Sequence, residues 1–183
     1  MLYLISMGFE EKDLSLKGLE AAKSCDLLYL ESYTNKFFAD TESLSKLIGK
    51  EVKAADRMTM ENESDKILEE AKKQNVGVLI PGDALAATTH ISLVLDAKRK
   101  GIPIEVIHGP SIFTVIGETG LQLYKFGMTT TLPFPEQKSA SWYEVIKMNL
   151  KNGLHTLVLL DVKVSGKIKG GLEEPGFPGP RYM

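Results

Sequence analysis

Five short apolar runs, separated by stretches with helical periodicity, constrain the fold of this chain more than any other feature. The runs are LYLIS, LLYLES, EVKAA, VGVLI and PIEVIHG, and they begin at residues 2, 27, 51, 76 and 103. Between them, apolar residues recur three and four positions apart, as on one face of a helix. Strands rich in Val, Ile and Leu that alternate with helices are typical of βαβ units. The sequence therefore predicts an α/β fold with a parallel sheet covered on both faces.

Capping residues mark where the helices of this part begin and end. We expect helices near 15–25, 40–49, 61–75 and 90–101. The predicted N-caps are Ser15 for the first, Asp40 or Thr41 for the second, and Thr88 or Thr89 for the fourth, with Gly49 ending the second. The predicted inner faces are Leu16, Leu19 and Ala22 in the first helix and Ile67, Leu68 and Ala71 in the third.

After Ser111 the pattern changes, and we predict a second domain. Residues 111–127 contain a short helical stretch broken by glycines, and 129–134 resemble a strand. An amphipathic helix is expected near 139–153, with Trp142, Val145, Ile146 and Leu150 facing inward. A strong buried strand is expected over 155–164, followed by a Gly- and Pro-rich loop. We expect a parallel α/β domain over 1–112 and an incomplete second α/β domain over 113–183.

Composition excludes several classes of protein. The chain is 43% hydrophobic and 25% charged, so a packed core is expected. A net charge of -2 argues against a general nucleic-acid-binding surface. The first apolar run is too short for a signal peptide or membrane span. The single cysteine, Cys25, cannot form an internal disulfide and is interpreted as a small core residue, which fits a reducing, cytoplasmic setting.

Three loops of small residues follow predicted strands. They are Ser6 to Phe9, Gly82 to Thr89 and Gly109 to Ile112. Ligands of open parallel sheets bind at the carboxyl ends of strands, and small residues let a ligand approach the backbone. The alternative is that Gly, Asp and Thr are there only to form turns. No loop has the GxGxxG or GxxxxGK[ST] pattern, so a dinucleotide or a nucleoside triphosphate is disfavoured.

Metal ligands and catalytic side chains are not apparent. The three histidines, His90, His108 and His155, have no partners at metal-ligand spacing and are interpreted as structural or capping residues. Ser111 follows a Gly-Pro pair without a local base, so we interpret it as an N-cap and possible ligand contact. No catalytic residue is assigned.

Several strings together resemble the diphthine synthase family, within the tetrapyrrole-methylase-like group of S-adenosylmethionine-dependent methyltransferases. They are MLYLI, DLSLKGLEA, GDALAATTH, IHGPSIFTVIGETGLQLYKFG, LHTLVLLDVKV and PRYM, in order from Met1 to Met183. The resemblance implies two α/β domains with the cofactor in the cleft between them. It implies methyl transfer to the amino group of a modified histidine on translation elongation factor 2. It also implies a cytoplasmic homodimer without a nucleic-acid or membrane partner.

The family's contacts with S-adenosylmethionine fall on six residues of this chain: Phe9, Asp83, Ala86, Ser111, Ile112 and Leu160. The resemblance implies that the Asp83 carboxylate bonds cofactor hydroxyls or its amino group. Ala86, Ile112 and Leu160 would give apolar cover, and main-chain groups of Phe9 and Ser111 would reach polar edges. A neutral amine attacking an activated methyl group needs mainly alignment, so no general base is assigned.

The chain departs from the family pattern in three ways. The first loop reads SMGFE where the family has a glycine-rich G-x-G-x-G, and Asp83-Ala84 replaces an Asp-Pro pair. Both changes are expected to loosen or reshape the cofactor site. The family chain also continues beyond PRYM, so we expect this one to be truncated at its C-terminus. Two alternatives stay open, a tetrapyrrole-type methyltransferase with another substrate and a non-catalytic binding module.

Overall fold

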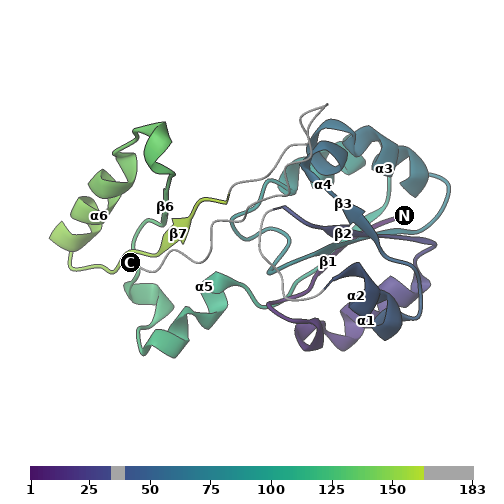
Figure 1. Ribbon diagram of the computed structural model, residues 1–183, viewed down its shortest axis with the longest axis horizontal. Coiled ribbons are helices and arrows are strands. Elements are labelled where there is room, and N and C mark those ends of the chain that lie inside the picture. The colour runs from purple at the N-terminus through teal and green to yellow at the C-terminus, as the bar shows by residue number, and fades with distance from the viewer. Residues whose placement is uncertain (34–39, 163–183) are drawn as a thin grey trace. The chain divides into compact units, whose positions relative to one another are not determined.

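The computed structural model describes residues 1–33 and 40–162, which divide into two compact units, Met1–Val115 and Ile116–Met183. The first unit is built on a five-stranded parallel sheet in the order β3-β2-β4-β1-β5 (Figure 1). Its strands are β1 (Leu2–Ser6), β2 (Leu27–Glu31), β3 (Lys53–Ala55), β4 (Val76–Ile80) and β5 (Ile104–Ile107). The predicted α/β fold with a parallel sheet is confirmed.

Helices cover both faces of this sheet, as the continuous apolar character of its strands requires. Figure 1 shows one pair of helices, α1 (Leu16–Ser24) and α2 (Thr41–Ile48), on one face. The other pair, α3 (Ser64–Ala71) and α4 (Ile91–Arg99), lies on the opposite face. All five residues of β4 are buried. Because side chains alternate along a strand, β4 contributes to the core on both sides of the sheet.

The predicted helix caps are confirmed for the first two helices. Ser15 accepts a hydrogen bond from the Gly18 backbone N–H at 3.0 Å. Asp40 accepts from the Ser43 N–H at 2.7 Å, and Gly49 ends α2 in the left-handed conformation with φ of 78°. These bonds satisfy N–H groups that have no partner inside the helix.

Two predictions for the helices of the first unit were wrong. Leu16 is 81% exposed, because it is the first residue of α1, before the helix reaches the sheet. The buried face of α1 is formed by Gly18 and Ala22. The residue preceding α4 is His90, and the threonines before it use their hydroxyl groups elsewhere. Thr88 donates to the Ala84 carbonyl, and Thr89 donates to Glu61 Oε1 at 3.1 Å.

Cys25 has the structural role expected of it. It is fully buried at the C-terminal end of α1, and its thiol donates to the Ala21 carbonyl at 3.2 Å. A Cβ atom at Gly77 of β4 would lie 2.9 Å from Cys25 Sγ, so the missing side chain lets the helix approach the sheet. Burial raises the pKa of the Cys25 thiol to about 11, which keeps it protonated and unreactive near neutral pH.

The direction in which successive strands are added to the sheet reverses beside β1. The chain passes from β1 to β2 and β3 on one side, inserts β4 next to β1, and then crosses to β5 on the other side of β1. The carboxyl ends of β4, β1 and β5 are therefore consecutive along one edge of the sheet. Such a point is where ligands of open parallel sheets bind.

The second unit is smaller and less regular. It contains 3₁₀ turns at Ile116–Thr119, Leu123–Lys125 and Pro135–Gln137, a parallel pair formed by β6 (Thr130–Leu132) and β7 (Val158–Leu160), and the helix α6 (Ser141–Lys151). The short helix α5 (Ile112–Val115) ends the first unit. The sequence predicted two domains with limits 1–112 and 113–183, and these limits stay a prediction.

Expectations for burial in the second unit were partly wrong. The strand predicted over 155–164 is only three residues long in the described part, and none of its residues is fully buried. Residues 163–183, where the loop was expected, lie outside the described residues. In α6, Leu150 is 73% exposed, and the buried side chain is the neighbouring Asn149. Asn149 is buried because it binds backbone, donating to the Met128 carbonyl at 2.8 Å and accepting from its N–H at 3.1 Å.

Within the described residues, no helix is both long enough and apolar enough to cross a membrane.

Candidate functional site

The loops that follow β1 and β4 are joined directly to each other. The Gly8 N–H donates to the Gly82 carbonyl at 3.1 Å, and the Gly82 N–H donates back to Gly8 at 2.7 Å. Both glycines have positive φ, 71° and 73°, which other residues adopt only at a cost. A Cβ atom at Gly82 would meet no atom within 4 Å, so the space beside this backbone is open.

Ser6 joins the first loop to the other two. Its hydroxyl oxygen accepts a hydrogen bond from the buried Ala84 N–H at 2.9 Å. A Cβ atom at Gly109 would lie 3.0 Å from Ser6 Cβ, so the third loop packs closely against the same residue. Ser6 is 1% exposed and makes these contacts within the protein. Ser6, which departs from the glycine-rich family pattern, therefore connects the loops at this edge, and its effect on the cofactor site stays a prediction.

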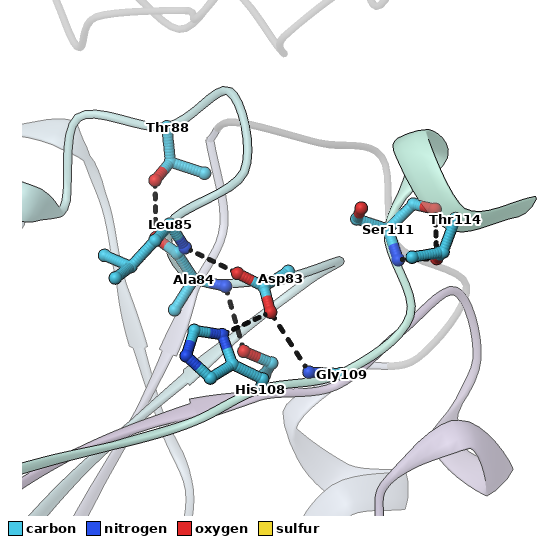
Figure 2. Close-up of polar contacts among 9 residues, drawn as sticks. Asp83, Ala84, Leu85, Thr88, His108, Gly109, Ser111 and Thr114 are labelled. Carbon is cyan, nitrogen blue, oxygen red and sulfur yellow. Dashed lines mark hydrogen bonds and ion pairs between the residues drawn. The ribbon is translucent and has the colours of Figure 1, made fainter. Parts of the chain in front are cut away.

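Asp83 connects the second loop to the third, as Figure 2 shows. One carboxylate oxygen, Oδ1, accepts from the Leu85 N–H at 2.9 Å. The other, Oδ2, accepts from the Gly109 N–H at 3.2 Å and lies 2.8 Å from Nδ1 of His108. Burial alone would raise the pKa of Asp83, but the bonds from Leu85, His108 and Gly109 outweigh it and hold the pKa below its usual value. Asp83 is therefore an ionised, internally bonded side chain.

The small residues of the second loop fold it into a compact turn. The Ala86 N–H donates to the Asp83 carbonyl at 3.1 Å. Thr88 Oγ1 donates to the Ala84 carbonyl, as Figure 2 shows. Ala87 has a φ of 58°, in the left-handed region that is uncommon for residues with a side chain. Such strain is frequent at functional sites, where the surrounding structure enforces it. The loop thus has mostly small side chains and is fixed by internal hydrogen bonds, and Leu85 is its exposed large apolar side chain.

Phe9 and Ser111, whose main-chain groups were expected to reach the cofactor, have N–H groups that are bonded within the protein. The Phe9 N–H donates to Asp13 Oδ2 at 2.9 Å. The Ser111 N–H donates to Thr114 Oγ1 at 2.9 Å, and Thr114 Oγ1 donates back to the Ser111 carbonyl at 2.8 Å (Figure 2). Ser111 directly precedes α5, and its carbonyl accepts from the N–H groups of Thr114 and Val115, so it lies at the predicted N-cap position. Any contact of these two residues with a ligand must use other atoms.

Five of the six residues predicted to contact a cofactor lie in the first unit, on the loops that the edge brings together. Phe9 and Ala86 are half-buried, Ser111 is 5% exposed, and Ile112 begins α5 with an exposed side chain. Leu160 lies at the end of β7 in the second unit and is 45% exposed. The role of each as a cofactor contact stays a prediction.

Three further residues matter at this edge: the sequence placed Ser6 and Gly109 in candidate loops without assigning them a contact, and His108 was interpreted as a structural or capping residue. Each lies at or just after the end of a strand in the β4-β1-β5 group. The signal was available in principle, because the carboxyl ends of parallel strands share one edge. It could not be used without the strand order, which decides that β5 lies beside β1.

The amino ends of β2 and β3 hold a shallow hollow of about 280 Å³. It is lined by Asp26, Leu27, Leu28, Lys50, Glu51 and Lys53. Because all strands run in the same direction, this hollow is at the end of the sheet opposite to the joined loops. We place the candidate site at the carboxyl edge, because the loops after β1, β4 and β5 are joined there by hydrogen bonds. Among residues 1–33 and 40–162, no group of three or more His, Cys, Asp or Glu side chains could hold a metal ion.

Comparison with known proteins identifies the family. Residues 1–174 match the Tetrapyrrole (Corrin/Porphyrin) Methylases. The chain belongs to this methylase family. The resemblance to diphthine synthases is also supported, since relatives named diphthine methyl ester synthase match the whole chain. They include proteins of Schizosaccharomyces pombe (47% identical), Saccharomyces cerevisiae (48%) and Homo sapiens (43%).

The fold agrees with this family membership. A crystal structure of a diphthine synthase superposes with a TM-score of 0.83 at 39% identity, covering 87% of this chain and 64% of the other. The chain spans 63–66% of the length of the three named relatives. That is just under two thirds of each relative.

The carboxyl edge suits the methyl donor of a methylase, S-adenosylmethionine. This molecule has no phosphate, in agreement with loops that lack phosphate-binding patterns. A Cβ atom at Gly82 would meet no atom within 4 Å, and Ala86 and Ala87 have small side chains, so this loop leaves room for a flat nucleoside. Leu85 and Ile112 are exposed apolar side chains on the two loops that Asp83 connects.

Proposed function

We propose that this chain is an S-adenosylmethionine-dependent methyltransferase of the diphthine synthase type, acting on the modified histidine of translation elongation factor 2. The observation that carries the proposal is identity of 43–48% over the entire chain to relatives named diphthine methyl ester synthase. Family membership and the joined loops at the carboxyl edge support the same chemistry.

The proposed cofactor contacts are Phe9, Asp83, Ala86, Ser111, Ile112 and Leu160. The structure changes the role that we propose for Asp83. Its carboxylate holds the second and third loops together through Leu85, His108 and Gly109, so its main effect is to fix the surface on which the nucleoside lies. Ala86 and Ile112 supply apolar contact, and Leu160 would add to it from the second unit.

The acceptors that we propose are the amine of the modified histidine and a carboxylate on the same side chain. The amine follows from the resemblance to diphthine synthases, and the carboxylate from the words methyl ester in the relatives' names. When bound, the cofactor supplies a methyl group on a positively charged sulfur that leaves readily. The chain has to align the acceptor and exclude water, which lowers the barrier through positioning.

The proposed setting is a cytoplasmic homodimer whose protein substrate is elongation factor 2, without a nucleic-acid or membrane partner. A net charge of -2 fits the absence of a general nucleic-acid-binding surface.

Calorimetric titration with S-adenosylmethionine tests the cofactor part of the proposal. We expect saturable heat with the wild-type chain and roughly tenfold weaker binding for Asp83→Ala, because three hydrogen bonds that hold the loops are lost. Asp96→Ala is the matched control, since Asp96 pairs only with Arg99 in the described structure and lies on α4. No heat from the wild-type chain, or equal binding by Asp83→Ala, contradicts the proposal.

A second candidate is methylation of a tetrapyrrole, which the family's description favours. A methylation assay separates the two candidate functions. It offers a porphyrinoid together with elongation factor 2 whose modified histidine carries an unmethylated amine. We expect label on the protein. Label on the porphyrinoid alone supports the second candidate, and cofactor binding without transfer to either supports a non-catalytic binding module.

A further inference from the structure

From the geometry at the carboxyl edge, we infer that His108 takes the proton from the acceptor amine, with Asp83 as the residue that positions its ring. The inference rests on the proposed function. It assigns a catalytic role that neither the family membership nor the relatives' names contain.

The contact between Asp83 and His108 fixes which ring nitrogen carries the hydrogen. Asp83 Oδ2 lies 2.8 Å from His108 Nδ1, and an ionised carboxylate can only accept. Nδ1 must therefore donate, which leaves the lone pair of the neutral ring on Nε2. Asp83 cannot easily turn away, because it is 12% exposed and its two oxygens also accept from the backbone of Leu85 and Gly109. A carboxylate that orients an imidazole in this way is a common arrangement for a general base.

The position of His108 gives its free nitrogen access to a substrate. The residue directly follows β5, on the same edge as the small-residue loop Gly82 to Thr89. Figure 2 shows the ring beside Asp83, below Ala84 and Leu85. The His108 side chain is 66% exposed. No hydrogen bond from Nε2 to another described residue is found.

The other two histidines lack this combination. His90 is 3% exposed, so an acceptor amine cannot reach its ring. His155 belongs to the second unit, and its ring packs against Phe126 with a centroid distance of 5.4 Å. Of the three histidines in the chain, His108 is the one that is both exposed and oriented by a carboxylate.

The chemistry of the acceptor explains why a base is required. An alkyl amine is protonated near neutral pH, since such groups have a pKa of about 10. Its nitrogen attacks only after one N–H bond has broken, so each methyl group added to nitrogen releases one proton. That proton forms a bond to Nε2, the resulting imidazolium is stabilised by Asp83, and the exposed ring then passes the proton to water. A carboxylate acceptor carries no proton and releases none.

His108→Asn tests the inference, because the Asn amide retains a donor near the position of Nδ1 and lacks any group at Nε2. We expect methyl transfer to the amine to fall about 100-fold, the usual size of a general-base contribution. Transfer to the carboxylate of an acceptor whose amine is already trimethylated should stay within about twofold. Added imidazole should restore amine methylation in His108→Asn. The dissociation constant of S-adenosylmethionine should also stay within about twofold of wild type.

A second measurement is independent of activity. Nitrogen-15 NMR of the wild-type chain should show His108 as a neutral ring protonated at Nδ1, and in Asp83→Asn the two ring tautomers should become mixed. Protonation at Nε2 in the wild type overturns the inference. So does unchanged amine methylation by His108→Asn, or an equal loss for amine and carboxylate acceptors, which a purely structural role would give. In these three outcomes the proposed function stands if the wild type transfers methyl groups; a wild-type chain that transfers none overturns both.

Discussion

Asp83 accepts hydrogen bonds from three donors that belong to two different loops: the Leu85 N–H in its own loop, and the His108 ring and Gly109 N–H after β5. The sequence suggested that this acid contacts a ligand directly. The structure shows it holding the loops that would form the ligand surface. A single half-buried carboxylate can therefore determine the shape of a site through contacts that a sequence does not display.

The pH dependence of stability tests this role of Asp83. Its pKa is lower in the folded chain than in the unfolded chain, where an Asp side chain has a pKa of about 3.9. The ionised carboxylate therefore stabilises the folded state above that value, and this contribution is lost as the pH falls through the folded-state pKa. We expect Asp83→Asn to be less stable than wild type at pH 7, with a difference that shrinks below about pH 4. Urea unfolding at pH 7, 5 and 3.5 measures it, and a difference that is constant with pH contradicts the assignment.

Ser6 gives a second prediction at this scale. Its hydroxyl is the acceptor for the Ala84 N–H, and both residues are buried. In Ser6→Ala that N–H loses its partner, which we expect to cost about 1–3 kcal/mol of unfolding free energy. Ser24→Ala is the matched control, because the Ser24 hydroxyl makes an exposed bond at the end of α1. Urea denaturation compares the variants, and equal stabilities would show that the Ser6 bond does not hold the edge.

At the scale of single elements, the sequence predicted the strands of the first unit and the caps of its first two helices well, and burial less well. Ser15, Asp40 and Gly49 act as expected because capping is local chemistry, decided by one side chain or one φ angle. Burial depends on what packs against a helix, which the sequence does not state. Leu16 and Leu150 carry the right side chain for a core, yet both lie on exposed surfaces.

A pair of leucine variants tests the corrected core. Leu44 on α2 is fully buried in a cluster with residues of α1 and of the sheet, whereas Leu16 on α1 is 81% exposed. We expect Leu44→Ala to cost about 2–5 kcal/mol of unfolding free energy. Leu16→Ala should change it by less than about 0.5 kcal/mol. Thermal and urea unfolding of both variants provide the comparison. Similar losses of unfolding free energy would show that Leu16 belongs to the core after all.

In the second unit, Asn149 replaces the apolar contact that was expected on α6. Its side chain binds the N–H and the carbonyl of Met128 and donates to Thr156 Oγ1 at 2.9 Å. Gly127 lies so close that a Cβ atom there would be 2.2 Å from Asn149 Oδ1. The polar side chain thus links α6 to the segments before β6 and β7.

Substitution of Asn149 should loosen this unit selectively. In Asn149→Leu, the N–H and carbonyl of Met128 lose their partners, so we expect faster amide exchange at Met128 and its neighbours. Amides of β1 and β4 in the first unit should be unaffected. Asn152→Leu is the control, because Asn152 is exposed and bonds only the Met148 carbonyl within α6. Faster exchange in both units, or in neither, would contradict the local role of Asn149.

At the scale of the whole molecule, the class of fold was predictable and the strand order was not. Alternating apolar runs and helices lead to a parallel sheet whatever the order of its strands. The site depends on the order β4-β1-β5, since only that order brings Ser6, Asp83 and Gly109 together. The three loops could be named from their small residues, but the bonds among them join residues that are distant in the chain, from 26 positions apart for Asp83 and Gly109 to 78 for Ser6 and Ala84.

Hydrogen exchange of the full chain with and without S-adenosylmethionine tests the central claim most directly, which is that the joined loops at the carboxyl edge hold the methyl donor. We predict slower exchange on addition of the cofactor in residues 82–89 and 109–112. Residues 26–28, 50, 51 and 53, which line the hollow at the opposite edge, should not change. Protection at that hollow with none in the loops would contradict the account.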